Sequence, residues 1–252
     1  MVEITPDAIV FWKSGYFSLN ATIVFTWMVM VLLALTAWLA TRRLSIEPPL
    51  SRWQNLLEII VTYMRNQIRE ITMQDSDRYL PFVGTLFLFI SVSNLLGIVP
   101  GYYPPTASLS TTAALAVCVF FAVPIYGIAQ QGLIGYLKHY SQPSVFMVPF
   151  HIIGELSRTL SLAVRLFGNI MSGTMIIAIL LLVTPLFVPI ILQALGLLIG
   201  LVQAYIFAIL ATVYIASATR VYEGKEQSDK EQSDKKQPDK EQSDKQEYKG
   251  GI

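Results

Sequence analysis

The chain has 252 residues, of which 54% are hydrophobic and 14% charged, with one cysteine and a formal net charge of +1. Eight basic and nine acidic residues lie after Thr219, which leaves 18 charges for the first 219 residues, too few to cover a water-exposed surface, since soluble domains carry about 25% charged residues. This excludes a soluble enzyme, a disulfide scaffold and a nucleic-acid binder, and predicts a membrane protein with a solvated tail.

The first long apolar segment predicts a membrane-spanning helix. Residues 14–41 carry no charge, and about 20 apolar residues cross a hydrocarbon core of about 30 Å. Arg42 and Arg43 follow directly, and basic flanks favour the cytoplasmic side. The N-terminus is therefore expected outside the cytoplasm.

The next helix-forming segment, residues 51–74, differs because five charged side chains interrupt it. Between them, apolar side chains recur at a spacing of three or four residues: Trp53, Leu56, Leu57, Ile60, Met64, Ile68 and Ile71. This pattern predicts an amphipathic helix that lies on the cytoplasmic membrane interface. Packing on another cytoplasmic protein is the alternative.

Two further spans are predicted, over residues 81–99 and about 109–137. The first ends at a loop rich in turn formers and tyrosines, and the second ends at Lys138 and His139, again basic on the expected inside. Pro124 is the candidate for a kink in the second of these spans. Cys118, in the same span, is expected to be buried and inert.

A charge-free run of 54 residues extends from Leu166 to Thr219. It is interrupted only near Pro185 and Pro189, which predicts two long helices joined as a hairpin. The second helix would be about 45 Å long at about 1.5 Å per residue, longer than the bilayer core, so tilt is expected. Five crossings bring the C-terminus into the cytoplasm.

The tail, residues 220–252, is separate in character from residues 1–219. Three copies of EQSDK and one KQPDK occupy residues 226–245, with balanced charge and no apolar periodicity. Such a segment buries too little surface to offset the entropy of ordering, so a disordered cytoplasmic tail is expected, with docking to a partner as the alternative. The predicted fold is thus an all-α membrane protein with about five embedded helices, one interfacial helix and this tail.

Arg165 is the residue least suited to a membrane helix. An arginine at mid-bilayer costs about 2.5–3.5 kcal/mol, so it should face a polar cavity or a partner. The charge-free run after it offers no carboxylate, so the anion is expected on another subunit. Arg158 can instead pair with Glu155 or extend to a lipid headgroup.

Small and polar residues extend the face of Arg165 at helical spacing, namely Arg158, Ser161, Gly168, Asn169 and Ser172. The last helix carries a comparable face, formed by Gln193, Gly196, Gly200 and Gln203. Its small residues allow close approach of another helix, and the face suits a sliding or water-lined contact. Gln203 as plain helix–helix hydrogen bonding is the alternative.

Asn94, with Ser91 and Ser93, is expected to form hydrogen bonds between helices, with ion-path lining as the alternative. His139 and His151 have no second metal ligand at a recognised spacing. The sequence contains no Walker loop, nucleophile elbow, catalytic carboxylate pair or CxxC motif. We therefore expect no cofactor, no metal and no hydrolysis by this chain alone.

Three blocks resemble subunit a of the membrane sector of rotary F-type ATP synthases. They are FLFISVSNLLGIVPG (87–101) with PPTASL (104–109), LSLAVRLFGNIMSG (160–173) and QAYIFAILATVYIA (203–216), in the family's order. The resemblance implies a non-catalytic stator subunit in a bacterial inner membrane, beside a rotor ring of subunit c and a peripheral-stalk subunit b. It implies two half-channels for the coupling ion, with protons as the default and sodium left open.

The resemblance also implies roles for individual residues. Arg165 matches the essential stator arginine, Gln203 its partner glutamine and Asn169 the asparagine of the same motif. The chain departs from the family pattern at three positions, where Thr174, Gly196 and His151 replace residues that are often ionisable. The residues expected to line the access paths are Asn94, His151, Glu155, Ser161, Ser172 and Thr174.

A secondary transporter that binds an anionic solute at Arg165 is the alternative function, and a purely structural membrane scaffold is a second. No inverted repeat and no second broken helix is visible in the sequence, which argues against the transporter. A scaffold does not explain an unpaired arginine.

Overall fold

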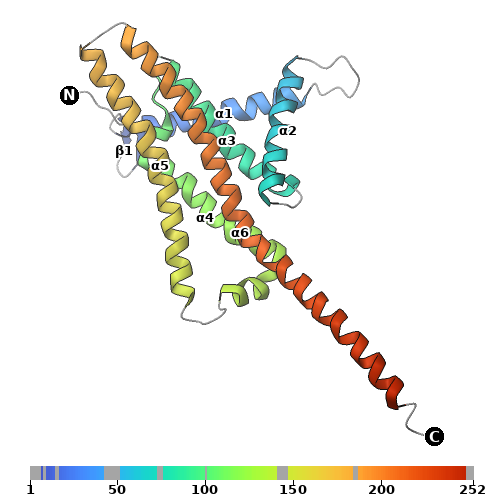
Figure 1. Ribbon diagram of the computed structural model, residues 1–252. Coiled ribbons are helices and arrows are strands. Elements are labelled where there is room, and N and C mark those ends of the chain that lie inside the picture. Colours follow the sequence, from blue (N-terminus) through green and yellow to red (C-terminus); the bar gives the residue numbers. More distant parts are fainter. Residues whose placement is uncertain are drawn as a thin grey trace.

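The computed structural model describes residues 7, 10–14, 17–42, 52–72, 76–99, 101–140, 147–183 and 187–247, with side chains described no further than Thr219 (Figure 1). Two short antiparallel strands, β1 (Val10–Ser14) and β2 (Phe17–Asn20), precede the first helix. The sequence pattern does not predict this hairpin, because two strands of four or five residues show too little periodicity. Apart from it, the regular structure in these ranges is helical, as predicted.

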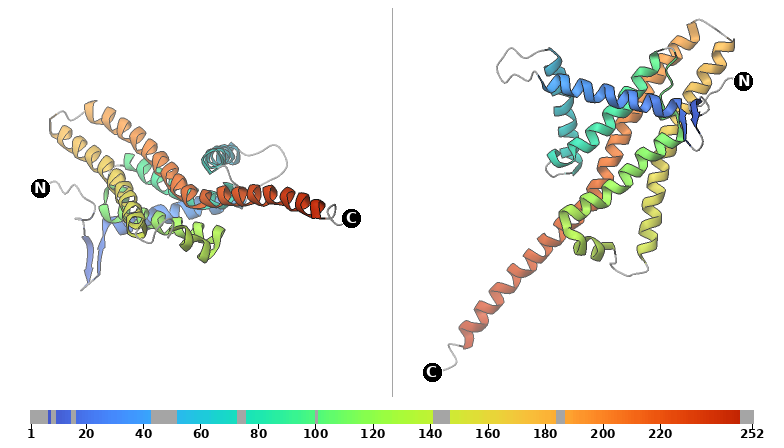
Figure 2. Two further views of the ribbon diagram at one scale, coloured as in Figure 1. Left: turned by 60° about the horizontal axis from the view of Figure 1, so that its bottom comes forward. Right: turned by 180° about the vertical axis from the view of Figure 1, so that it is seen from behind.

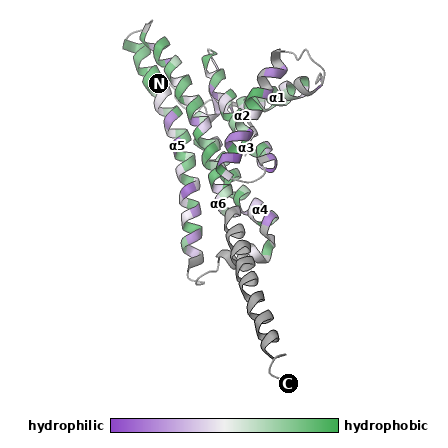
Figure 3. Cartoon of the chain, turned by 45° about the vertical axis from the view of Figure 1, so that its right-hand side comes forward, coloured by the Kyte–Doolittle hydropathy of each residue, from purple (hydrophilic) through white to green (hydrophobic). Residues whose placement is uncertain are grey.

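Five helices in the described part of the chain are long and apolar enough to cross a membrane, which confirms the predicted spans. They are α1 (Ala21–Thr41), α3 (Leu80–Leu95), α4 (Leu109–Tyr140), α5 (Met147–Val183) and α6 (Phe187–Glu247). Hydrophobic residues cover the adjoining ends of α5 and α6 (Figure 3). The predicted all-α membrane fold is confirmed.

Helix α2 (Arg52–Thr72) is amphipathic, as the sequence predicts, and crosses the direction of α1 steeply (Figure 1). Its apolar face packs on the chain's own bundle, where Ile68 is buried beside Tyr79 and Val83. On its polar side, Arg65 forms an ion pair with Asp77, with 2.9 Å between Nε and Oδ1. A helix in this position suits the predicted membrane interface.

Helix α4 is interrupted at Gly132 and not at Pro124. Gly132 has φ 72° and ψ 161°, outside the helical region, a conformation that glycine adopts at little steric cost. Pro124 lies within the helix, as membrane helices allow. The prediction for Cys118 was wrong as well, because this side chain is exposed on the outside of the bundle.

Helices α5 and α6 lie side by side as the predicted hairpin (Figures 1 and 2). The turn between them, residues 184–186, lies outside the described residues. The backbone of α6 continues through the repeats to Glu247, where the sequence favours disorder; Glu, Gln and Lys are good helix formers, which gives the local reason. No side-chain contact is described beyond Thr219, so the independence of the tail stays a prediction.

Two apolar clusters hold the bundle together. The first joins four helices through Leu86, Ile90, Ala116, Val119, Leu162, Ala163, Leu166, Ala204, Phe207 and Ala211. The second joins α2 to α3, α4 and α6 through Ile68, Tyr79, Val83, Ala122, Val123, Ala208 and Ile215. Alanines supply much of the contribution from α6, which lets its backbone lie close to its neighbours.

Candidate functional site

Arg165 is exposed on α5, although Leu162 and Leu166, on either side of it, are buried in the first cluster. None of the side chains that the structure describes forms a hydrogen bond or an ion pair with its guanidinium. Among the described side chains of α5, only Leu162, Ala163 and Leu166 are buried. The arginine therefore points away from the core that its neighbours build.

The predicted face of α5 is open along its length. Residues at a 3-4-3-4 spacing are all exposed, namely Arg158, Ser161, Arg165, Gly168 and Ser172. Asn169, beside this row, is half-buried. The chain thus presents two arginines among small and polar neighbours on a surface that it does not cover itself.

The corresponding face of α6 packs against α3. Gln193 donates from Nε2 to the carbonyl of Gly97 at 3.1 Å. A Cβ added at Gly200 would lie 3.1–3.2 Å from the side chain of Asn94. The predicted close approach of a helix is confirmed, and the approaching helix is α3 of the same chain.

Asn94 connects three parts of the bundle. Its Nδ2 donates to the carbonyl of Gly200 at 3.0 Å, and its Oδ1 accepts from the hydroxyl of Thr106 at 2.9 Å. Asn94 is 7% exposed and Thr106 is fully buried. The prediction that Asn94 forms hydrogen bonds between helices is confirmed.

Gln203 lies at nearly the same level of the hairpin as Arg165. Arg165 lies 18 residues before Val183 and Gln203 lies 16 after Phe187, about 27 and 24 Å at about 1.5 Å per residue. Next to them in sequence, Leu166 and Ala204 share the first cluster. Gln203 is 7% exposed, and no hydrogen bond joins it to Arg165 or to another of the described side chains.

The other predicted residues of α5 are distributed along the helix and not gathered at one point. The Ser172 hydroxyl donates to the carbonyl of Asn169, and the Thr174 hydroxyl to that of Met171, at 3.0 and 2.9 Å. Both hydroxyls are therefore occupied by their own helix. His151 is exposed and Glu155 half-buried, near the first turns of α5.

Arg158 differs from Arg165 in having an aromatic neighbour. Its guanidinium lies 5.5 Å from the ring centroid of Tyr214 on α6, within the range of a cation–π interaction. This contact is the one that the structure describes for Arg158, in place of the expected pairing with Glu155. It ties α5 to α6 two turns before Arg165.

Three buried hydroxyls near Asn94 and in the following loop form no hydrogen bond of standard geometry with the described residues: Ser91, Ser93 and Tyr102. Burial raises the pKa of Tyr102, and the neighbouring Ser93 hydroxyl lowers it by a smaller amount. An unsatisfied buried hydroxyl costs about 1–3 kcal/mol, which favours water beside it. The sequence singled out the two serines but not Tyr102, because tyrosines in a loop usually serve as interfacial anchors.

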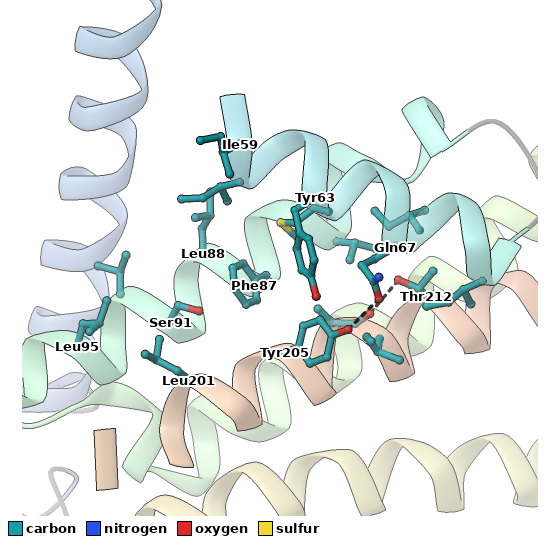
Figure 4. Close-up of a pocket in the computed structure, with 18 residues that line it drawn as sticks. Ile59, Tyr63, Gln67, Phe87, Leu88, Ser91, Leu95, Leu201, Tyr205 and Thr212 are labelled. Carbon is teal, nitrogen blue, oxygen red and sulfur yellow. Dashed lines mark hydrogen bonds between the residues drawn. The ribbon is translucent and has the colours of Figure 1, made fainter. Parts of the chain in front are cut away.

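A cavity lies elsewhere, between α2, α3 and α6 (Figure 4). It measures about 500 Å³ and is almost entirely apolar. The hydroxyl of Tyr205 donates to Gln67 Oε1 at 2.8 Å across it. Arg165 does not line this cavity, and no group of three metal-binding side chains occurs in the described ranges.

Known proteins resemble this chain over most of its length. The family model described as ATP synthase A chain matches residues 23–216. ATP synthase subunit a 2 of Acaryochloris marina is 59% identical over 228 residues, which cover 90% of this chain and 97% of that protein. ATP synthase subunit a 1 of Chlorobaculum parvum is 60% identical over 88% of this chain and 98% of its own length. ATP synthase subunit a of Albidiferax ferrireducens is 61% identical over 87% of this chain and 95% of its own length.

Proposed function

This chain belongs to the ATP synthase A chain family, and we propose that Arg165 is the cation through which it performs the family's function. Membership makes it an ion-conducting stator subunit of an F-type ATP synthase, embedded in the membrane by several helices. Gln203 is its proposed partner on α6, and Asn169 the third residue of the ion-translocating site.

The observation that carries this assignment is the exposure of an unpaired guanidinium on α5. A cation in the membrane requires an anion or a polar cavity, and no partner for Arg165 occurs among the described residues. A carboxyl group on another subunit supplies that anion. We propose that it belongs to the rotor ring of subunit c, which passes the exposed face of α5.

The chemistry follows from the effect of environment on a carboxylic acid. An acid that faces lipid is neutral because desolvation raises its pKa, and one opposite a fixed guanidinium ionises because the ion pair lowers it. Arg165 thus causes each arriving rotor carboxyl to release its ion and become negatively charged. Its own positive charge blocks direct passage of the coupling ion between the two half-channels. Each charge that crosses about 100 mV supplies about 2.3 kcal/mol, which turns the rotor.

The two half-channels are proposed on opposite sides of Arg165. Asn94, Ser172 and Thr174 are proposed to line the outer half-channel. The buried hydroxyls near Asn94 that form no hydrogen bond of standard geometry favour water there. The proposed lining residues of the inner half-channel are His151, Glu155 and Ser161. We propose protons as the coupling ion; ATP synthesis that depends on sodium at constant pH would assign sodium instead.

The proposed topology has the N-terminus outside and the C-terminus in the cytoplasm of a bacterial cell, with the chain in the inner membrane. Residues 1–219 form the embedded domain and residues 220–252 the cytoplasmic tail. Besides subunit c, the proposed partners are a peripheral-stalk subunit b and membrane lipid. The chain itself catalyses no reaction.

Arg165→Ala tests the assignment. In sealed vesicles that contain the whole complex, this variant should assemble but lose ATP synthesis driven by an imposed ion gradient. Arg158→Ala is the matched control, since it removes a guanidinium from the same face and should retain most of the rate. Coupled synthesis retained by Arg165→Ala would refute the proposal, and uptake of an anionic solute by the isolated chain would favour a transporter.

A further inference from the structure

Asp7 joins the ends of two membrane spans through its carboxylate. Its Oδ1 accepts a hydrogen bond from the Thr22 hydroxyl and its Oδ2 one from the Ser108 hydroxyl, each at 2.6 Å. Thr22 lies in the first turn of α1, and Ser108 directly precedes α4. The carboxylate is therefore held at two helix N-termini, where a negative charge is favoured.

Further polar groups lie between Asp7 and the interior of the bundle, and Ser108, Thr106 and Asn94 among them are buried. The Ser108 hydroxyl bonds to that of Ser110 at 2.7 Å, and two residues before Ser108 the buried Thr106 donates to Asn94. Asn94 in turn donates to Gly200, one helical turn before Gln203 on α6. Polar groups are thus spaced between Asp7 and the level of Arg165, in two hydrogen-bonded sets, one around Ser108 and one around Asn94.

Charge is scarce on the side of the molecule where this series begins. With the N-terminus outside, the outer segments are residues 1–20, 99–108 and 184–188, and their charged residues are Glu3, Asp7 and Lys13. Among the side chains that the structure describes there, Asp7 carries the charge. It is half-buried, so water still reaches it.

We propose that Asp7 is the carboxylate at the outer mouth of the ion path and raises the rate at which the coupling cation reaches Asn94 and Gln203. A fixed negative charge at the opening of a passage with low-dielectric walls focuses the field and increases the local concentration of cations. Asp7 acts by position and charge, and no bond is made or broken at it. The inference rests on the proposed function and orientation.

The test compares ion conduction by wild type and Asp7→Asn in vesicles that hold the complete membrane sector. Asn keeps the size of the side chain and one oxygen acceptor but removes the charge. At constant pH and membrane potential, ionic strength is set with choline chloride. Because the Debye length falls from about 30 Å at 0.01 M to about 3 Å at 1 M, wild type should conduct about threefold faster than Asp7→Asn at 0.01 M and about equally at 1 M.

Two controls separate steering from a structural role. Asp7→Glu keeps the charge and should conduct faster than Asp7→Asn at low salt. Glu58→Gln removes one exposed carboxylate from α2, on the opposite side of the membrane, and should leave the ratio at both salt concentrations near one. Each variant is checked for its content of assembled complex.

Two outcomes would overturn the proposal. Equal rates for wild type and Asp7→Asn at low salt would mean that the carboxylate does not act on the ion. Equal slowing at both salt concentrations, or loss of assembly, would make Asp7 only a structural link between α1 and α4. Conduction that persists in Arg165→Ala with full coupling would instead refute the proposed function, so the two failures are distinguishable.

Discussion

Arg165 and Arg158 occupy the same open face of α5, seven residues apart, but their surroundings differ. Arg158 has the ring of Tyr214 beneath it, whereas none of the described groups forms a hydrogen bond, an ion pair or a ring contact with the guanidinium of Arg165. A cation with an internal neighbour serves the fold, and a cation without one is available to a group outside the chain. The contrast makes Arg158 a natural control for Arg165.

Replacement of Arg165 by lysine should abolish coupled ATP synthesis in sealed vesicles. A lysine keeps the charge but lacks the planar guanidinium, whose donors form two parallel hydrogen bonds with the two oxygens of a carboxylate. Arg158→Lys should retain most of the activity, because an ammonium group also interacts with an aromatic ring. If Arg165→Lys supported synthesis at more than half the wild-type rate, charge alone would be sufficient at this position.

The equal depth of Arg165 and Gln203 leads to a second prediction. Gln203→Arg should partly rescue ion pumping in Arg165→Gln, because the guanidinium would still stand at the same level of the hairpin. Pumping is measured in the double variant against each single variant, at equal content of assembled complex. A double variant no better than Arg165→Gln would mean that the cation must come from α5.

Residues of the proposed site stand out in the sequence where their polarity conflicts with an apolar helix, as for Arg165, Gln203 and Asn94. Asp7 and Tyr102 do not, because polar residues are ordinary in terminal segments and loops. What distinguishes them is tertiary: Asp7 meets hydroxyls 15 and 101 residues away in sequence, and Tyr102 is buried. No local pattern contains that information.

At the scale of elements, the contact between α3 and α6 depends on the absence of a side chain at Gly200. A Cβ there would lie 3.1–3.2 Å from Asn94, whereas nothing lies within 4 Å of a Cβ at Gly196. Both glycines belong to the same helix face, so the two positions differ chiefly in the space available. They form a matched pair for substitution.

Gly200→Ala should lower the thermal stability of the purified protein, and Gly196→Ala should leave it unchanged or raise it. The first change forces Asn94 aside and weakens its bond to the Gly200 carbonyl, and overpacking of this kind costs about 1–3 kcal/mol. The second gains up to about 1 kcal/mol of helix propensity. Equal melting temperatures for the two variants would contradict the observed close approach.

The spans were predictable to within a few residues because length and hydrophobicity suffice to define them. The break in α4 was not, because a proline in a membrane helix is compatible with helical dihedral angles, and nothing in the local sequence distinguishes Gly132, which has the positive φ, from the other glycines of the helix. The interfacial helix α2 shows both contributions. Its periodicity predicted the apolar face, and only the fold shows that α3 and α6 cover it.

At the scale of the whole molecule, other helices of the chain cover one side of the α5–α6 hairpin and leave the other side uncovered. Helices α3 and α4 cover α6, while α5 leaves nearly all of its apolar length uncovered. An exposed apolar surface of this extent is compatible with lipid, but a row of small and polar residues that contains Arg158 and Arg165 is not. The open face therefore fits a partner that carries its own charge, which is the role proposed for the rotor ring.

The tail projects away from the bundle, since α6 leaves the bundle and continues to Glu247 (Figure 2). The repeats beyond Gly224 contain no apolar periodicity, so they have no face with which to join the apolar clusters. The membrane-embedded bundle therefore derives its stability from residues before Arg220. We expect the tail to be dispensable for folding of residues 1–219.

Deletion of residues 225–252 should leave membrane insertion, assembly and coupled ATP synthesis close to wild type, because the deleted sequence offers no apolar periodicity with which to pack on the bundle. The measurements are the content of assembled complex and the rate of ATP synthesis in sealed vesicles. A second variant, in which residues 226–245 are scrambled, keeps the length and charge of the tail and removes only its repeated order. If the deletion prevented assembly and the scrambled tail did so too, the repeat sequence itself would be a docking segment for another subunit; if the scrambled tail assembled, length and charge alone would account for the loss.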